Sequence, residues 1–425
     1  MSTIDKVIKV VAMLPNIIGS AGDSINERQL IKFLRKYCDV VTYSLLPISN
    51  IGRLFDKSSL SLVKKDVRLE LLLPLIGYPY TIGLLLEVLY GLIFTILAVF
   101  KRPKLIYART SGLALFPVAF KRIHKAKVIV KIPSLLEEEL KGVGDIKVHM
   151  CDYKAFEIIL RVLERYIIFK ADRVAIPSLQ FYRELCKRRL IKSRNPPLIV
   201  PPGIDLTKIE RIRKTDETNY SNSHGEITIG YVGLLEWWQG VDMLVKAVGT
   251  LQREAKTKFK LLIVGDGPTR KKIEKLCREL DVRCEFTGFI PHEDALKMMK
   301  KMKVLVVPRF RSATTETNIP IKVIEAWAMG VPIIITKHRI FLDIEKSTEM
   351  PVLMCEPEPR SVANAITAVI SDRSFVERLV SIGSLVAKEF DYNRIAKKIV
   401  RVVAEELNNQ TDSPIMEMRM MGSIR

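Results

Sequence analysis

The sequence predicts an α/β protein built from two domains, each with a parallel β-sheet covered by helices. Its 425 residues exceed what a single hydrophobic core usually holds, so two domains of about 200 residues are expected. In both halves, short apolar runs alternate with longer amphipathic segments, which is typical of consecutive βαβ units. The polar segment 208–225 lies between the two series and is predicted to be a linker or surface loop.

The first series opens with a strand over 7–14, a loop over 15–24, a helix, and a second strand over 39–44. This order is Rossmann-like, although the loop offers only Gly19 and Gly22 and the motif G-x-G-x-x-G is absent. Further strands are predicted over 105–108, 127–132, 173–177 and 198–200, and helices over 113–124, 154–169 and 179–189.

Residues 71–100 form an unusually apolar segment, with Glu87 as their only charged residue. The part from 82 to 100 is nearly long enough to cross the roughly 30 Å hydrocarbon core of a bilayer. A single crossing would put the strands 7–14 and 105–108 on opposite sides, and one parallel sheet could not then contain both. Two alternatives remain: a helix or hairpin in the membrane interface, or a helix buried against the sheet.

The net charge of +21 is concentrated in the first half of the chain. Residues 1–210 contain 34 basic and 19 acidic side chains, and nine Lys or Arg residues without any acid lie between Lys101 and Lys131. An anionic partner is indicated. An acidic lipid surface is favoured over nucleic acid, because the basic run has an apolar neighbour and lacks interleaved aromatic side chains. A solvated basic face is the alternative.

Metal and disulfide sites are not expected. The six cysteines are scattered without a C-x-x-C motif, which predicts reduced thiols. The five histidines show no ligand spacing, and the absence of Asp-x-Asp argues against a metal-held nucleoside diphosphate. The first apolar run, 7–14, is short and interrupted by Lys9, so no secretory signal is expected.

The second half repeats the alternation of strands and helices. Strands are predicted over 227–232, 259–264, 285–288, 304–308 and 331–336, and helices over 243–254, 269–280, 321–329, 361–370, 376–390 and 393–407.

The stretch from Arg309 to Thr336 has the pattern of an anion-binding site. A polar loop is predicted over 311–318, and Pro320 suits a helix start because its φ is fixed and it has no N–H to lose. Gly330 ends the helix before an apolar strand. Unpaired N–H groups and the helix dipole bind anions at such a helix start.

Lys322 and Glu325 give this helix its chemistry. Lys322 puts a positive charge in the first turn, where the helix dipole disfavours one unless an anion is bound. Glu325 could accept two hydrogen bonds from a ribose diol, each worth about 1.5–3 kcal/mol. An ordinary surface pair at i, i+3 is the alternative.

The pattern P-x-K-x-x-E-A-x-A-x-G-x-P-I over 320–333 is similar to the donor-site signature of the retaining glycosyltransferases of family 4, the group 1 type. Their GT-B fold has two facing Rossmann-like domains with a deep cleft between them. The resemblance covers nearly all of residues 1–407, and it implies sugar transfer from a nucleotide-sugar with retention and without a bound metal. The family usually has a second Glu eight residues before Glu325, where this chain has Thr317 beside Glu316.

Particular residues take expected roles from this resemblance. The expected donor-binding residues are Gly22, Gly233, Gln239, Gly265, Gly267, Phe289, Ile290, Arg309, Arg311, Asn318, Ile319, Pro320, Ile321, Lys322 and Glu325. The catalytic candidates are Glu316, Thr317, Arg109 and Lys131, and the acceptor-side candidate is Glu138. His292 is expected at a helix start without a catalytic role.

The chain also departs from the family. Leu234 and Gln239 replace the usual Arg and Lys of the diphosphate site, so Arg309, Arg311 or Lys322 is expected to supply the lost charge. Trp237 and Trp238 either shape the site or simply pack. Pro133 stands where relatives often have a His, so no His role is assigned there.

The predicted organisation is an acceptor and membrane-docking domain over 1–205 and a nucleotide-sugar domain over 206–390. A helix over 391–407 is expected to cross back to the first domain, and 408–425 is expected to be disordered. The expected partners are a nucleotide-sugar, a glycan or lipid-linked acceptor, and an anionic membrane on the cytoplasmic side; no cofactor is expected. The alternatives are another GT-B enzyme, such as a nucleotide-sugar epimerase, or a non-catalytic binding or scaffold subunit.

Overall fold

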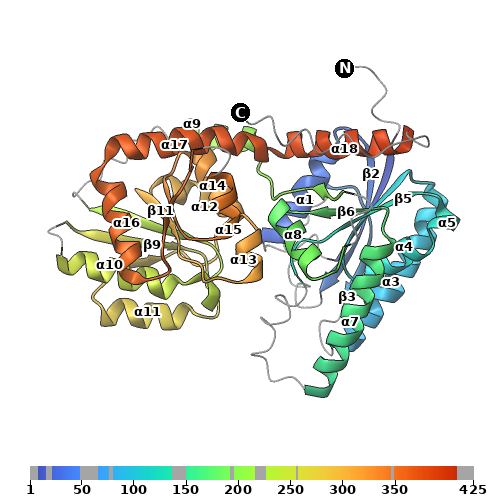
Figure 1. The fold of residues 1–425 in the computed structure, drawn as a ribbon, viewed down its shortest axis with the longest axis horizontal. Helices are drawn as coiled ribbons and strands as arrows, with labels where there is room; N and C mark the ends of the chain where they lie inside the picture. The colour runs from blue at the N-terminus through green and yellow to red at the C-terminus, as the bar shows by residue number, and fades with distance from the viewer. Residues whose placement is uncertain are drawn as a thin grey trace. The chain divides into compact units, whose positions relative to one another are not determined.

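The chain divides into two compact units in the computed structural model, Met1–Gly203 with Tyr392–Ser423, and Ile204–Asp391 with the last two residues (Figure 1). The structure describes residues 8–15, 22–47, 66–75, 80–135, 150–191, 196–215, 226–254, 257–345 and 349–408. Glu138 and the predicted tail after Asn408 lie outside these residues.

The first unit is built on a sheet of seven parallel strands in the order β3-β2-β1-β4-β5-β6-β7. These strands are β1 (Lys9–Leu14), β2 (Asp39–Pro47), β3 (Leu69–Leu75), β4 (Leu105–Arg109), β5 (Lys127–Lys131), β6 (Arg173–Ile176) and β7 (Leu198–Ile199). The strand order reverses between β1 and β4, so their carboxyl ends define the point where Rossmann-like domains bind ligands.

Helices cover both faces of this sheet. The described helices of the unit are α1 (Gly22–Leu34), α3 (Tyr80–Lys101), η3 (Gly112–Ala114), α4 (Leu115–Ala119), α5 (Lys121–His124), α7 (Met150–Lys170), α8 (Leu179–Lys187) and α18 (Tyr392–Asn408). Helices α1 and α18 pack against one face through residues such as Leu30, Phe33 and Ile399. Helix α3 covers the other face with Phe94 and Ala98. The prediction of a single helix over 113–124 is wrong, because this segment forms the three short helices η3, α4 and α5.

The apolar segment 71–100 is partly strand, which the sequence analysis missed. Its first part belongs to β3, and a helix of 22 residues, α3, follows. The leucines of β3 lack the β-branched pattern of a typical strand. Pro74 is tolerated there because β3 lies at the sheet edge, where a missing N–H costs no ladder hydrogen bond.

The second unit contains a six-stranded parallel sheet in the order β10-β9-β8-β11-β12-β13. Its strands are β8 (Ile227–Val232), β9 (Phe259–Val264), β10 (Cys284–Phe286), β11 (Val304–Val307), β12 (Ile333–Thr336) and β13 (Leu353–Cys355). The order reverses between β8 and β11, which pair through Ile229 and Val304. The predicted α/β class with two parallel-sheet domains is confirmed.

The helices of the second unit include several that the sequence analysis did not predict. They are α9 (Leu206–Thr215), η4 (Trp237–Gln239), α10 (Val241–Glu254), α11 (Arg270–Glu279), α12 (His292–Lys300), α13 (Ala313–Thr317), α14 (Ile321–Met329), α15 (Arg339–Glu345), α16 (Pro359–Ser371), α17 (Arg373–Ala387) and η5 (Lys388–Phe390). Residues 208–215 of the predicted linker belong to α9, which buries Ile209 and Ile212. The predicted loop 311–318 contains α13, which Ser312 and Thr315 begin with reciprocal capping hydrogen bonds.

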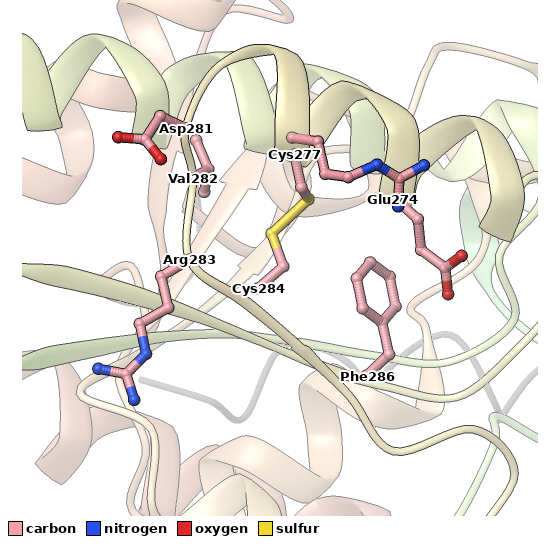
Figure 2. Close-up of a pocket in the computed structure, with 8 residues that line it drawn as sticks. Glu274, Cys277, Asp281, Val282, Arg283, Cys284 and Phe286 are labelled. Atoms are coloured by element: carbon pink, nitrogen blue, oxygen red, sulfur yellow. A yellow bond between two sulfur atoms is a disulfide. The ribbon is translucent and has the colours of Figure 1, made fainter.

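A disulfide joins Cys277 at the end of α11 to Cys284 at the start of β10. The prediction of unpaired thiols is therefore wrong for this pair. The chain turns back after α11, which brings two cysteines seven residues apart into contact. Figure 2 shows the surface pocket beside it, which Glu274, Arg283 and Phe286 also line. The start of β10 lies at the amino edge of the parallel sheet, the edge opposite to the ligand-binding end.

Candidate functional site

The carboxyl ends of β8 and β11 meet at the reversal point of the second sheet. Gly233 directly follows β8, and Pro308 and Arg309 directly follow β11. Helix α14 begins at Ile321 after Pro320, so its first-turn amides are available at the same edge. This edge is where an open parallel α/β sheet binds its ligand.

Lys322 reaches from the first turn of α14 to the loop after β8. Its Nζ donates to Tyr231 Oη and to Gln239 Oε1, at 3.2 Å in each case, and lies 4.3 Å from the centre of the Tyr231 ring. Tyr231 is held in place by its own hydrogen bond to the Leu234 carbonyl at 2.8 Å. Lys322 therefore brings a positive charge next to Gln239, one of the two positions where a family cation was expected to be lost.

Arg309 is the second cation of this site, and it is buried whereas Lys322 is half-buried. It is 6% exposed, its guanidinium lies 4.9 Å from the centre of the Trp238 ring, and its Nε has no hydrogen-bond partner. Trp238 in turn accepts a backbone hydrogen bond from Phe310 N at 2.9 Å. Trp238 thus packs on a cation of the site, while the neighbouring Trp237 is 59% exposed.

Burial makes both cations costly. It lowers the pKa of Lys322 well below its usual value, and the nearby Arg309 lowers the pKa of Lys322 further. Burial also lowers the pKa of Arg309 to about 10. Among the described residues, no carboxylate forms an ion pair with either cation. Two adjacent charges of one sign with little access to water are stabilised most directly by a multivalent anion.

Two glycines allow the close contacts of this site. A Cβ at Gly233 would lie 2.6 Å from Lys322 Nζ, and a Cβ at Gly240 would lie 2.0 Å from the Pro308 carbonyl oxygen. Gly233 also has a φ of +133°. Any larger residue at Gly233 would displace the ammonium group of Lys322.

Gly265 and Gly267 contact backbone rather than an open space. A Cβ at Gly265 would lie 2.1 Å from the Gly233 carbonyl oxygen, and one at Gly267 would lie 2.6 Å from the Leu235 carbonyl oxygen. The two glycines therefore set the position of the loop that follows β8. Asp266 between them accepts a hydrogen bond from the Gly267 amide and pairs with Arg270.

Glu325 is a buried carboxylate one turn after Lys322, and it has an unexpected partner. It is 7% exposed, and its Oε1 lies 2.5 Å from His292 Nε2 at the start of α12. His292 was expected only as a helix-start residue, so this contact was missed. Phe289 and Ile290 precede α12. Phe289 is 72% exposed and Ile290 packs against the core, so the residues before His292 run from the surface towards Glu325.

Glu316 and Thr317 are tied to structure near them. Glu316 Oε2 accepts from the Arg339 backbone N–H at 2.9 Å, and its Oε1 lies 3.4 Å from His338 Nδ1. Arg311 approaches Glu316 at 3.7 Å with its side chain 60% exposed. The Thr317 hydroxyl donates to the Ala313 carbonyl within α13. The structure therefore places Glu316 at the start of α15.

His338 links this group to Arg309. It is 1% exposed, and its Nε2 lies 3.1 Å from Thr336 Oγ1, which donates to the Arg309 carbonyl at 2.6 Å. Burial, followed by the charge of Arg309, lowers the pKa of His338 to about 4. A neutral imidazole thus supports the strand end that carries Arg309.

The remaining donor candidates form the turn before α14. Asn318 ends α13, Ile319 packs against the core of the unit, and Pro320 and Ile321 begin the next helix. Gly22 starts α1 in the first unit. Among the described residues, no group of three or more His, Cys, Asp or Glu side chains could hold a metal ion.

The first unit contributes a separate group of polar side chains. Lys131 at the end of β5 forms a buried ion pair with Glu27 of α1, with Nζ and Oε1 2.6 Å apart. Burial, together with the charge of Glu27, raises the pKa of the fully buried Tyr107. Arg109 ends β4 beside them and is half-buried. Glu27 and Tyr107 were missed because neither a helical Glu nor a strand Tyr is distinctive in sequence.

Sequence comparison matches part of the chain to a known family. The family described as "Glycosyl transferases group 1" matches residues 213–406. The match covers most of the second unit and most of α18. An uncharacterized glycosyltransferase of Methanocaldococcus jannaschii is 28% identical over 194 residues, which are 44% of this chain and 48% of that protein.

A second relative has a named reaction. The GalNAc-α-(1→4)-GalNAc-α-(1→3)-diNAcBac-PP-undecaprenol α-1,4-N-acetyl-D-galactosaminyltransferase of Campylobacter jejuni is 24% identical over 196 residues. These residues are 46% of this chain and 53% of that enzyme. The chain thus spans about half the length of these relatives.

Solved structures match nearly the whole chain. Sucrose-phosphate synthase from Thermosynechococcus elongatus superposes with a TM-score of 0.70 at 18% identity, over 94% of this chain and 99% of the other. Anabaena HepE, solved in complex with UDP-glucose, gives a TM-score of 0.63 at 16% identity over 94% and 99%. The chain therefore has the GT-B fold of these solved proteins.

Proposed function

We propose that this protein is a glycosyltransferase that moves a sugar from a nucleotide-sugar to an acceptor. The observation that carries this proposal is a pair of adjacent cations, the buried Arg309 and the half-buried Lys322, at the carboxyl edge of the second sheet. In the transfer, the bond between the sugar and the nucleoside diphosphate breaks, and the diphosphate leaves with the bonding electrons. Fixed cations and a helix start stabilise the negative charge that develops on that leaving group.

Glu325 completes the donor site in this proposal. Its carboxylate is positioned to accept hydrogen bonds from the ribose, one turn of helix from the phosphate-binding Lys322. The exposed Phe289 offers a surface for the base. The match of residues 213–406 to the glycosyltransferase family model, and the UDP-glucose bound by HepE, support the same assignment.

We further propose a lipid-linked saccharide as the acceptor, at the cytoplasmic face of a membrane, with retention of the anomeric configuration. The lipid-linked acceptor is supported by the undecaprenol-linked glycan in the name of the Campylobacter relative and by the apolar helix α3. No metal is required in this proposal, because two protein cations neutralise the diphosphate. Lys131 and Glu27, at the carboxyl edge of the first sheet, are proposed to act on the acceptor side.

The test is a transfer assay with uridine, guanosine and adenosine diphosphate sugars and detergent-solubilised lipid-linked saccharides. Release of nucleoside diphosphate that depends on the acceptor supports glycosyl transfer, and the anomeric coupling constant of the product reports retention. Release without acceptor would instead indicate an enzyme such as an epimerase.

A non-catalytic binding subunit is the second candidate. It is favoured by the replacement of usual polar family residues by Leu234, Thr317 and Pro133. Such a protein would bind a nucleotide-sugar, with a clear thermal shift, but would transfer nothing to any acceptor.

A further inference from the structure

Helix α3 presents an apolar stripe to solvent although it belongs to a folded unit. Leu85, Leu89, Ile96 and Phe100 are 67%, 50%, 49% and 79% exposed, and their spacing of four or seven residues puts them on one side of the helix. Residues Ile82–Lys101 have a mean hydropathy of 2.4 and are 33% buried. The helix is thus long and apolar enough for a membrane, and only a third of this window is buried.

The opposite side of α3 is fixed to the first unit. Gly91 and Gly112 allow close backbone contact, since a Cβ at Gly91 would lie 2.8 Å from the Leu113 carbonyl oxygen. Glu87, the only charged residue of the segment 71–100, accepts a hydrogen bond from the Gly112 amide at 3.0 Å. The strands before and after the helix, β3 and β4, belong to one sheet, so α3 cannot cross a bilayer.

A second helix extends the exposed apolar surface. Figure 1 shows α7 running alongside α3, and the two helices contact each other. On α7, Ile158, Val162 and Phe169 are 64%, 65% and 61% exposed at helical spacing. The sequence indicated apolar surface only in the segment 71–100, and the contribution of α7 comes from the structure.

Basic side chains border this surface. Arg102 and Lys104 follow α3, and Arg122 and Lys125 flank the 64%-exposed Ile123 on α5, which contacts α3. All four basic residues are exposed, and the stretch 101–131 contains no acid. A second copy of the chain would bring these like charges together, whereas a lipid surface with anionic headgroups would neutralise them.

We propose that the exposed faces of α3 and α7, with the tip of α5, form a docking surface that inserts into the headgroup and acyl boundary of an anionic bilayer. The two helices lie side by side with apolar side chains exposed on each, as a surface that inserts between headgroups requires. Helix α3 starts after the carboxyl end of β3, so the apolar stripe begins at the edge where the first sheet binds its ligand. This docking surface deepens the proposed function and rests on its lipid-linked acceptor. Such an acceptor could reach the carboxyl edge of the first sheet without leaving the bilayer.

Vesicle flotation of the full chain tests the docking surface. The probes are vesicles of phosphatidylcholine alone and of phosphatidylcholine with a quarter phosphatidylglycerol. We expect binding to the anionic vesicles that weakens with salt. The triple variants Leu85→Ser/Leu89→Ser/Phe100→Ser and Ile158→Ser/Val162→Ser/Phe169→Ser should each lose about a hundredfold in partitioning, since each buried side chain contributes to insertion. Arg122→Ser/Lys125→Ser should lose about fivefold per charge.

Matched controls lie in the second unit. Leu385→Ser removes a side chain that is 61% exposed on α17, and Lys271→Ser/Lys272→Ser removes two exposed charges on α11. Both should bind vesicles like the parent protein. The triple variants of α3 and of α7 are tested separately. Thermal unfolding measures whether each variant is folded, so that a single unfolded variant does not decide the result.

The outcomes separate docking from catalysis, because flotation needs neither nucleotide nor acceptor. Vesicle binding without sugar transfer would leave the docking surface standing and overturn the proposed function. Absence of binding to anionic vesicles, or equal binding by the α3 and α7 variants, would overturn the docking surface. A dimer in sedimentation that the α3 variant dissociates, with no vesicle binding, would assign this face to self-association instead.

Discussion

Replacing Lys322 by Met tests whether the buried ammonium group exists for an anionic ligand. Met fills similar space beside Tyr231 and removes the charge. Because Lys322 has no described carboxylate in an ion pair and its pKa is lowered by burial and by Arg309, its charge costs folding free energy in the unliganded protein. The variant should therefore unfold at the same or a higher temperature than the parent.

Ligand binding should change in the opposite direction. A hydrogen bond from a charged donor to a phosphate oxygen contributes about 1.5–3 kcal/mol. Its loss predicts a Kd for the preferred nucleoside diphosphate that is about 10- to 150-fold higher. Titration calorimetry on both proteins measures this ratio, and Lys271→Met on the surface of α11 is the control, with an unchanged Kd.

Proton uptake gives the same prediction a second readout. The pKa of Lys322 is low in the unliganded protein, and a bound diphosphate should raise it. At a pH between these two pKa values, Lys322 takes up a proton when the diphosphate binds. Affinity should fall as pH rises through that window, and the calorimetric enthalpy should depend on the ionisation enthalpy of the buffer. Lys322→Met should lose both effects. An unchanged Kd, or a destabilised unliganded variant, would refute the assignment of Lys322 to the phosphate site.

Three further predictions follow from the same unit. Glu325→Ala should reduce transfer at least about tenfold by removing the charged partner of the ribose, and near-parental turnover in the transfer assay would remove Glu325 from the site. Gly233→Ala should weaken nucleoside diphosphate binding in calorimetry, because its Cβ would lie 2.6 Å from Lys322 Nζ, whereas unchanged affinity would show that Lys322 acts elsewhere. His338 has its pKa lowered from 6.5 to about 4, so the unfolded state binds the extra proton and stability falls as pH drops from about 6.5 towards 4. The loss should reach about 2 kcal/mol at pH 5 relative to pH 7 in urea unfolding, and His338→Phe should flatten that dependence; an equal slope in both proteins would contradict it.

Much of the fold was predictable from the sequence, because parallel strands and amphipathic helices leave distinct periods. β8 and β9 were predicted with their observed bounds, since each is a mostly apolar run between polar segments. β3 was missed because its leucines also suit a helix, and only pairing with β2 makes it a strand. The helix α9 was missed because most of its residues are polar, and its two buried isoleucines are recognised only once it packs.

The candidate site was predictable in part. Pro320 and the residues after it predicted a helix start, and α14 begins at Ile321. The partners of the charged side chains depend on tertiary contacts that no local pattern encodes. Lys322 meets Tyr231 and Gln239 from the β8 loop, 91 and 83 residues away in sequence. The contact between Glu325 and His292 likewise joins two helices.

The most direct measurement is a crystal structure of the chain with its preferred nucleoside diphosphate, chosen by thermal shift. The account predicts phosphate oxygens within hydrogen-bond distance of Lys322 Nζ and the Arg309 guanidinium, and ribose hydroxyls on the Glu325 carboxylate. A nucleotide bound away from the carboxyl ends of β8 and β11, with both cations still unpaired, would contradict it.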